Sequence, residues 1–162
     1  MLQPLPSVLL IDAYTDEREL YAEFLRYSGC PVEEAESGRQ AIRKALALRP
    51  EVIATDLMLK DMDGLDLVRQ FRGHQATRST PLIVLTGYAF EQDVQRAREA
   101  GCDAVLVKPC LPAQLLREIT RLLRHRAQQL HAQTRRILDE SKSTRQASAA
   151  ARDERTRRRS GE

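Results

Sequence analysis

Four polar residues, spread over almost a hundred positions, carry side chains that could do chemistry. Asp12 and Asp56 supply carboxylates, Thr86 supplies a hydroxyl and Lys108 an ammonium. Two carboxylates can hold a hard divalent cation such as Mg²⁺, and one carboxylate can attack phosphorus to form an aspartyl-phosphate. An ammonium pairs with phosphoryl oxygens, and charge compensation of this kind does most of the work in phosphoryl transfer. Brought together, these residues would form a phosphoacceptor site.

Each of the four residues ends or directly follows a short apolar run. The runs are SVLLID at residues 7–12, EVIATD at 51–56, PLIVLT at 81–86 and AVLV at 104–107. Such runs predict strands buried on both faces of a parallel sheet. The carboxyl ends of parallel strands meet at one edge, so the four side chains are expected to converge there. Taken singly, each residue also fits a structural role, as a helix cap or a solvated loop residue.

Amphipathic helical patterns alternate with these runs, and a fifth short strand is expected at Val32–Ala35. The segment Asp16–Ser28 places Leu20, Phe24 and Tyr27 at helical spacing, and Asp16 with Glu19 resembles a capping box. Ser37 with Gln40 forms a second such box. Further helices are expected after Met62-Asp63-Gly64, at Glu91–Ala100 and from Pro112. Five strands alternating with five helices predict an α/β sandwich around a parallel sheet.

At this point the sequence resembles the receiver domains of two-component response regulators, over about residues 7–125. The matching segments are Val8–Asp12, Asp56–Leu59 with Met62–Gly64, Thr86-Gly87, Ala100–Ala104 and Lys108-Pro109. The resemblance implies a flavodoxin-like, doubly wound, five-stranded parallel sheet with strand order 2-1-3-4-5 and five helices. It also implies that Asp56 is the phosphoacceptor. Asp12, Asp56 and the backbone carbonyl of Met58 are the implied Mg²⁺ ligands.

The resemblance further implies a phosphate-binding and switch group made of Thr86, Gly87 and Lys108. Gly87 would leave room for a phosphoryl donor to approach. Val105 stands where the family often has an aromatic switch residue, three positions before the lysine. A valine cannot rotate between two positions as an aromatic ring does, so an aromatic-coupled output is not expected.

A second departure concerns the metal. The family usually has two adjacent acids after the first strand, whereas here Ala13 follows Asp12. Because hard-cation sites are tuned by the number of charged ligands, Mg²⁺ is expected to bind weakly. Asp16 lies nearby in the sequence and offers a carboxylate, although its position also suits a helix cap.

Charge and composition divide the chain into a receiver domain at residues 1–125 and a basic tail at 126–162. Residues 1–112 hold 13 basic and 17 acidic residues, whereas residues 113–162 hold 13 basic and 6 acidic ones. No Val, Ile, Leu, Phe or Tyr follows Leu138. A segment of this composition cannot bury a core, so the end of the tail is expected to be disordered.

Two interpretations of the tail remain open. Leu116, Leu123, Leu130 and Ile137 recur every seven residues, which favours an extended helix that pairs with a second chain as a homodimer. The other interpretation is a solvated helix that frays after about residue 130. A basic cluster at Arg155 and 157–159 lacks accompanying aromatics, so nucleic acid is not expected as a partner.

These observations predict a signalling protein and not an enzyme. Asp56 would accept a phosphoryl group from a histidine kinase or phosphotransfer protein, and the signal would pass to a downstream protein target. Residues after 125 are too few for a folded output domain. No run is long enough to span a membrane, no secretory signal is evident, and the cytoplasm is the expected compartment. One alternative, kept open by Ala13, is a phosphorylation-independent scaffold of receiver shape. Another is a small nucleic-acid binder that acts through the basic tail.

Overall fold

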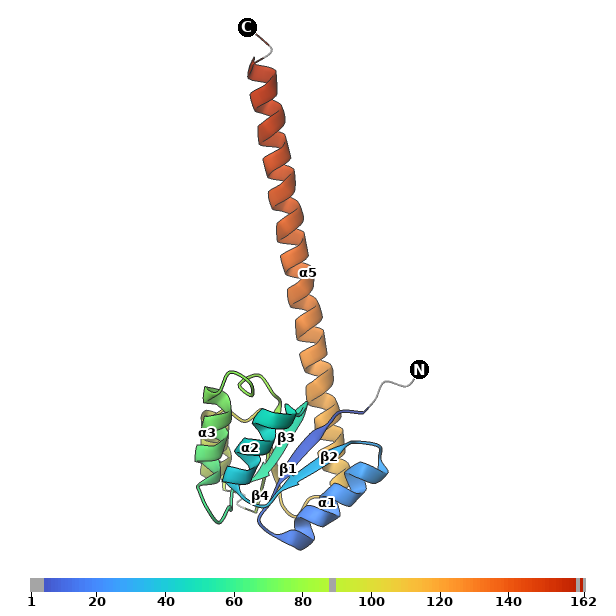
Figure 1. The fold of residues 1–162 in the computed structure, drawn as a ribbon, viewed down its shortest axis with the longest axis vertical. Coiled ribbons are helices and arrows are strands. Elements are labelled where there is room, and N and C mark those ends of the chain that lie inside the picture. The colour runs from blue at the N-terminus through green and yellow to red at the C-terminus, as the bar shows by residue number, and fades with distance from the viewer. Residues whose placement is uncertain (1–4, 88–89, 160, 162) are drawn as a thin grey trace. The chain divides into compact units, whose positions relative to one another are not determined.

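The computed structural model describes residues 5–87, 90–159 and 161 of the chain, and its centre is one parallel sheet. The strands run in the order β2-β1-β3-β4-β5 (Figure 1). Their bounds are β1 Val8–Ile11, β2 Val32–Ala35, β3 Val52–Asp56, β4 Leu82–Thr86 and β5 Ala104–Val107. The predicted flavodoxin-like topology is therefore confirmed, and each strand lies within a residue or so of the apolar run that predicted it.

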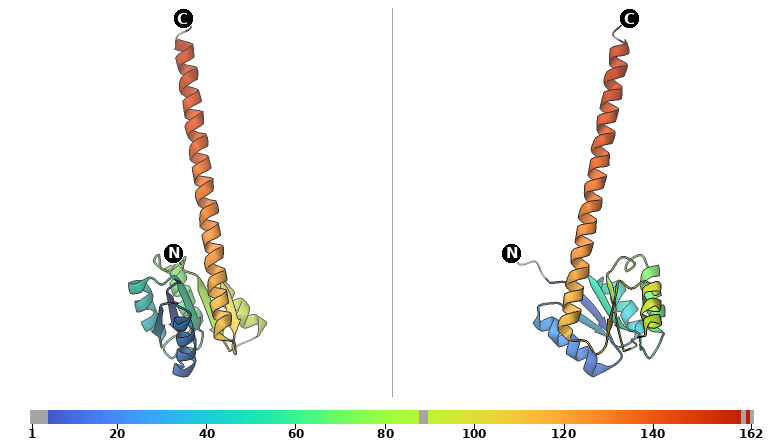
Figure 2. Two further views of the ribbon diagram at one scale, coloured as in Figure 1. Left: turned by 90° about the vertical axis from the view of Figure 1, so that its right-hand side faces the viewer. Right: turned by 180° about the vertical axis from the view of Figure 1, so that it is seen from behind.

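Helices alternate with the strands along the chain and lie on both faces of the sheet (Figures 1 and 2). Their bounds are α1 Thr15–Tyr27, α2 Gly38–Leu48, α3 Gly64–Gly73, α4 Glu91–Ala100 and α5 Pro112–Arg159. This alternation joins parallel neighbours by crossovers and covers both faces of the sheet. It therefore explains why every residue of β1, β3 and β4 is buried.

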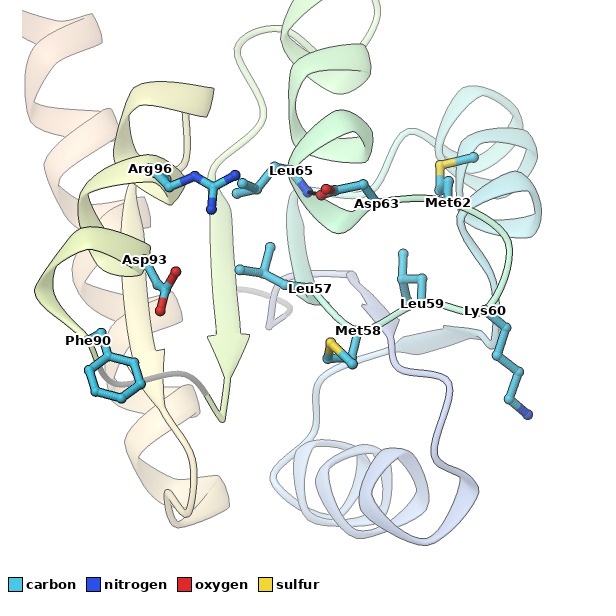
Figure 3. Close-up of a pocket in the computed structure, with 10 residues that line it drawn as sticks. All are labelled: Leu57, Met58, Leu59, Lys60, Met62, Asp63, Leu65, Phe90, Asp93 and Arg96. Carbon is cyan, nitrogen blue, oxygen red and sulfur yellow. Dashed lines mark hydrogen bonds between the residues drawn. The ribbon is translucent and has the colours of Figure 1, made fainter.

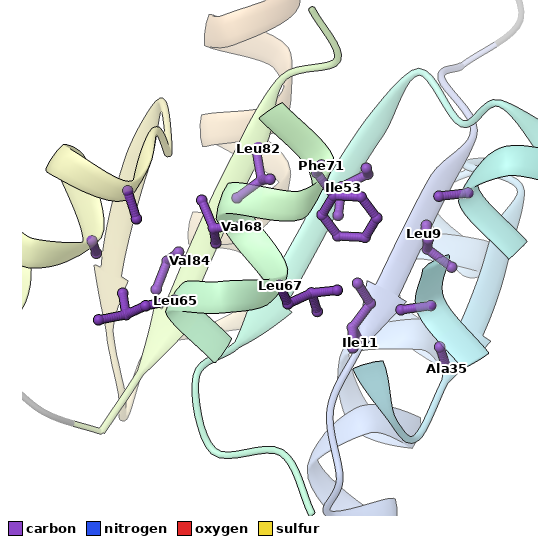
Figure 4. Packing of buried hydrophobic residues seen from close by; sticks show 14 residues of the cluster. Leu9, Ile11, Ala35, Ile53, Leu65, Leu67, Val68, Phe71, Leu82 and Val84 are labelled. Atoms are coloured by element: carbon purple, nitrogen blue, oxygen red, sulfur yellow. The ribbon is translucent and has the colours of Figure 1, made fainter. Parts of the chain in front are cut away.

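The core on one face of the sheet forms under α2, α3 and α4. Figure 4 shows Leu67, Val68 and Phe71 of α3 packed over side chains of the central strands. Successive strand residues point to opposite faces, so Leu9 and Ile11 of β1 belong to this cluster. Burying each such large apolar side chain stabilises the fold by about 1.5–3 kcal/mol. This packing fixes the positions of the strand ends that carry the polar residues.

Helix α1 differs from its prediction. It begins at Thr15, and its N-cap is Tyr14, whose side chain makes no capping hydrogen bond, so the predicted Asp16 capping box is wrong. Its buried face is formed by Tyr21, Ala22 and Leu25, whereas Tyr27 is 93% exposed. The apolar residues of α1 surround much of the helix, and only contact with the sheet selects the stripe that is buried.

The start of α2 agrees with its prediction and is tied to a distant loop. Ser37 Oγ accepts a hydrogen bond from the Gln40 N–H at 3.3 Å. The carboxylate of Asp61, in the loop between β3 and α3, accepts from the Gly38 and Arg39 N–H groups at 2.8 and 3.0 Å. These hydrogen bonds, the one from Arg39 first, lower the pKa of Asp61. Asp61 therefore anchors the loop that follows Asp56.

The same loop depends on Gly64. The Gly64 N–H donates to the Leu57 carbonyl at 3.1 Å, and a Cβ at Gly64 would lie 2.3 Å from Leu57 Cα. Asp63 Oδ1 then caps α3 by accepting from the Leu65 N–H at 2.7 Å. Glycine thus allows the chain to turn back on itself immediately after β3, which is where Asp56 lies.

The chain divides into two units, Met1–Leu122 and Leu123–Glu162. Helix α5 continues to Arg159, so the second unit is helical well beyond residue 130. Its alanine, arginine and glutamine residues are good helix formers, and a composition that forbids a core does not forbid a helix. The basic side chains 157–159 lie outside the described ones. No described helix is long and apolar enough to cross a membrane.

Candidate functional site

Three charged residues from separate parts of the chain meet at the carboxyl edge of the sheet. Asp12 directly follows β1, Asp56 ends β3 and Lys108 directly follows β5. The Lys108 Nζ lies 2.8 Å from Asp12 Oδ2 and 3.1 Å from Asp56 Oδ2. The expected convergence of Asp12, Asp56 and Lys108 at this edge is therefore confirmed. Asp12 and Asp56 are only 1% and 4% exposed, so the lysine compensates two buried negative charges.

A fourth charged residue, Glu17 of α1, completes the cluster and was not predicted from the sequence. Glu17 Oε2 accepts a hydrogen bond from Lys108 Nζ at 2.6 Å. Asp16, the acid that the sequence suggested, is exposed and lies outside the group of carboxylates. Helix α1 begins only at Thr15, so no helical spacing relates Glu17 to Asp12 or Ala13, and no signal in the sequence singled Glu17 out.

Each buried carboxylate has one oxygen fixed by the backbone and the other turned to the lysine. Asp12 Oδ1 accepts from the Tyr14 N–H at 2.8 Å. Asp56 Oδ1 accepts from the N–H groups of Leu57 and Met58, the latter at 3.1 Å. Among the described residues, no buried side-chain nitrogen or oxygen lacks a hydrogen-bond partner. The two acids are thus held in fixed orientations before any ligand binds.

The electrostatics of the cluster follow from burial and from the lysine. Burial raises the pKa of Asp12 above its ordinary value, while hydrogen bonds from Lys108 and the Tyr14 N–H oppose that change. Burial disfavours the ammonium of Lys108, but its hydrogen bonds to Asp12 and Glu17 outweigh this and raise the pKa of Lys108. Lys108 therefore stays positively charged over the physiological pH range.

Thr86 ends β4 beside this cluster, and Gly87 directly follows it. Leu85 is the parallel partner of Asp56 in the sheet, so Thr86 ends its strand one position beyond it. Thr86 is fully buried, and its carbonyl accepts the Lys108 N–H at 2.8 Å. A Cβ at Gly87 would meet no atom within 4 Å, so the fold itself does not require glycine there. The sequence thus placed both residues correctly at the shared strand edge.

An open cleft of about 630 Å³ lies over the cluster. The residues that line it are Tyr14, Glu17, Leu20, Tyr21, Asp56, Met58, Gly87, Lys108, Pro109 and Cys110. Its floor near α1 is fixed by Tyr21, whose hydroxyl donates to the Cys110 carbonyl at 2.9 Å. Burial, followed by the contact of the Tyr21 hydroxyl with the Cys110 Sγ at 3.2 Å, raises the pKa of Tyr21, so the phenol remains neutral. The cleft gives a reagent access to Asp56.

A neighbouring groove of about 750 Å³ lies between the loop after β3 and α4 (Figure 3). Met58, which is about half exposed, lines both this groove and the cleft over Asp56. On the α4 side, Phe90, Asp93 and Arg96 line it (Figure 3). The groove contains no cluster of acids among the described residues, so the chemistry belongs to the smaller cleft.

The predicted metal ligands are suited to a hard cation. Asp12, Glu17 and Asp56 each offer a carboxylate oxygen, and these atoms all lie within 4.8 Å of one another. The ammonium of Lys108 already contacts all three carboxylates, so a positive charge occupies the centre of the group. Carboxylate oxygens are the donors that Mg²⁺ prefers. The cluster can therefore hold a metal, and it contains one more local carboxylate than the sequence indicated.

Comparison with known proteins agrees with this geometry. The response regulator receiver domain family matches residues 8–120. The chain is 34% identical over 122 residues to transcriptional regulatory protein ResD of Bacillus subtilis (strain 168), a match that covers 75% of this chain and 50% of ResD. It is 39% identical over 119 residues to transcriptional regulatory protein GltR of Pseudomonas aeruginosa, covering 73% of this chain and 49% of GltR. The chain thus spans about half the length of these curated relatives.

Solved structures show the same fold over the receiver unit. Chemotaxis response regulator CheY4 of Vibrio cholerae aligns with a TM-score of 0.69 at 31% identity, covering 72% of this chain and 98% of CheY4. The receiver domain of a sensor histidine kinase from Pseudomonas aeruginosa aligns with a TM-score of 0.67 at 30% identity, covering 72% of this chain and 96% of that domain. That structure has a magnesium ion coordinated in its active site cleft. Given its sheet order, its strand-edge cluster and these matches, the chain belongs to the response regulator receiver domain family.

Proposed function

We propose that this chain is a phosphorylation-dependent signalling receiver, in which Asp56 accepts a phosphoryl group from a phosphohistidine on a partner kinase or phosphotransfer protein. The observation that carries the proposal is the arrangement around Asp56. Its Oδ1 is fixed by backbone N–H groups, its Oδ2 contacts Lys108, and a cleft opens above it. A buried but accessible carboxylate with a cation beside it is suited to attack phosphorus.

In this proposal an oxygen of Asp56 attacks phosphorus while the bond between phosphorus and the donor's imidazole nitrogen breaks. The electron pair of that bond stays on the imidazole nitrogen, which then takes up a proton. Lys108 pairs with an oxygen of the transferred group in exchange for part of its contact with Asp12 and Glu17. Thr86 and Gly87 lie on the same edge, where the Thr86 hydroxyl can donate to a further phosphoryl oxygen. The chain acts as an acceptor here and not as an enzyme.

A bound Mg²⁺ would neutralise negative charge on the phosphoryl oxygens. We assign its binding to Asp12, Asp56 and Glu17, with the backbone carbonyl of Met58 as a further ligand. Glu17 supplies the third carboxylate that Ala13 fails to provide, since it reaches the same group from α1. A long side chain that is half exposed loses more rotamer freedom on binding than a short buried one, so affinity remains below that of a site with adjacent acids.

Phosphorylation is tested by incubating the full chain with Mg²⁺ and a small phosphodonor, followed by intact-mass measurement. We expect wild type to gain the mass of one phosphoryl group and the Asp56→Ala variant to gain none. Asp66→Ala, at an exposed acid of α3, is the matched control and should be modified like wild type. A phosphorylated Asp56→Ala protein would show that another residue is the acceptor.

The metal assignment is tested separately by calorimetric titration with Mg²⁺. Removal of one charged ligand in Glu17→Gln should weaken binding by about 1–3 kcal/mol, or one to two decades. Asp16→Asn, which removes the neighbouring exposed acid, should bind like wild type. Ala13→Asp should strengthen binding and should rescue the Glu17→Gln variant. Equal affinity of wild type and Glu17→Gln would remove Glu17 from the ligand set.

Ala13 also favours a second function, that of a phosphorylation-independent scaffold. Ala13 is almost buried beside Asp12 and contributes no charge, and Lys108 already compensates the acids that remain. If wild type stays unmodified while Ala13→Asp gains a phosphoryl group, the scaffold becomes the better account of the natural chain. In either case we place the chain in the cytoplasm, with a downstream protein as the target.

A further inference from the structure

The helix beyond residue 122 presents apolar side chains to solvent. Helix α5 has 48 residues, far longer than the receiver unit needs to cover its sheet. Every side chain from Ala127 to Arg152 is exposed, and Leu130, Ile137 and Leu138 are 55%, 58% and 54% exposed. Most helical stability in proteins comes from packing an amphipathic face, so this segment is expected to pair.

The apolar side chains follow a heptad rather than scattering around the helix. Leu123, Leu130 and Ile137 are spaced by seven residues. The positions four residues after them carry Ala127, Thr134 and Ser141, which are small. Large residues at one core position and small ones at the other let two helices approach closely in a two-stranded coiled coil.

The charged residues beside the core positions of α5 indicate which partner fits this helix. Consider two identical helices that pair in parallel and in register. A residue that lies three positions after a large core residue then faces a residue of the other helix whose number is five higher. This rule pairs Glu140 with Arg145 of the second copy, twice by symmetry. The pair before it joins Gln133 to Leu138, which covers the exposed leucine without placing two like charges together.

We propose that the segment from Leu123 to Arg145 is a homodimerisation helix, which pairs in parallel and in register with the same segment of a second copy of this chain. The pairing requires no phosphorylation and is therefore independent of the chemistry at Asp56. Residues 123–162 contain eleven basic and five acidic residues, so this stretch of each copy carries a net charge of +6. This repulsion weakens the dimer at low salt, so dimerisation should strengthen as salt rises.

Sedimentation of the full chain over about 1 to 200 µM tests the proposal. Wild type should pass from monomer to dimer within this range, at lower concentration in high salt than in low salt. Replacing Ile137 by Gln should keep the chain monomeric, because glutamine keeps helix propensity and removes the apolar contact. Wild type that stays monomeric throughout would overturn the proposal. The proposal would also be overturned if the segment bound nucleic acid as a monomer, with an affinity that falls as salt rises.

A charge exchange tests orientation and register. Glu140→Arg and Arg145→Glu each turn both attractive contacts into repulsive ones, and each alone should weaken the dimer by about tenfold. Mixed together, or combined in one chain, the two substitutions restore opposite charges and should recover wild-type association. Asp139→Arg and Lys142→Glu make the same charge changes at outward positions and should leave association unchanged. Equal weakening by Asp139→Arg, or no recovery on mixing, would rule out this pairing.

Discussion

The charged cluster at the sheet edge and the helix after Leu122 differ in how deeply their charged side chains are buried. In the cluster, Lys108 contacts three carboxylates, and two of them are almost completely buried. In the helix, the charged side chains between residues 127 and 152 are all exposed. Buried charges interact strongly and depend on every partner, whereas exposed ones contribute little singly. Perturbations should therefore be large and cooperative in the first region and small and local in the second.

The largest effect is expected for Lys108→Met. The substitution leaves Asp12 and Asp56 buried without a cation, and breaking a buried pair in this way costs about 3–5 kcal/mol. Urea unfolding of the receiver unit measures the loss, and added Mg²⁺ should restore more stability to this variant than to wild type. Arg69→Met, which removes an exposed pair with Asp66, is the control and should cost less than about 1 kcal/mol. A similar cost for both variants would mean that burial does not control the strength of the cluster.

A smaller loss of folding stability is expected for Gly64→Ala. The added Cβ would overlap Leu57, and relieving such overpacking costs about 1–3 kcal/mol. Because Leu57 follows Asp56, the phosphorylation rate measured by mass should fall together with stability. Gly73→Ala is the matched control: no atom lies within 4 Å of its Cβ position, and alanine improves helix propensity. If Gly64→Ala unfolds at the same urea concentration as Gly73→Ala, the close approach to Leu57 does not require glycine at position 64.

In the helix of the second unit, Ala149→Gly should act only locally. Glycine in an exposed helix interior costs about 1 kcal/mol, so helicity measured by circular dichroism should fall. The unfolding midpoint of the receiver unit should not change, because Ala149 is exposed and lies in the separate unit. A shift of that midpoint would show that the two units are energetically coupled.

The smallest effect is expected for Asp61→Asn and depends on pH. The pKa of Asp61 is lowered in the folded chain, so its contribution to stability is present above 3.8 and is lost as the pH falls through the folded value. The variant should therefore be slightly less stable than wild type at pH 7, and the difference should be smaller near pH 3. Asp16→Asn, which removes an exposed acid of α1, serves as the control for the loss of one surface charge. Urea unfolding at the two pH values measures the difference, and an equal gap at both would exclude titration of Asp61 as its cause.

Local chemistry in the sequence determined the element order and the polar residues at strand ends. Apolar runs that end in Asp12, Asp56 and Thr86 predict strands. They also predict that these residues share the carboxyl edge of the sheet, because parallel strands all end on one side. The N-cap of α2 at Ser37 could also be predicted from the sequence, because a cap involves residues only three positions apart. These features depend on neighbours in sequence, so they needed no knowledge of the packed structure.

Only the tertiary structure decided how α1 is rotated, and this rotation decided the site. The sequence predicted an apolar stripe through Leu20, Phe24 and Tyr27 of α1. The sheet instead buried Tyr21 and Leu25. That choice turned Glu17, and not Asp16, toward Lys108. Successive helical residues point about 100° apart, so a carboxylate one position away faces a different direction. The face that a helix buries is set by contacts with residues far along the chain, and those contacts assemble only when the sheet forms.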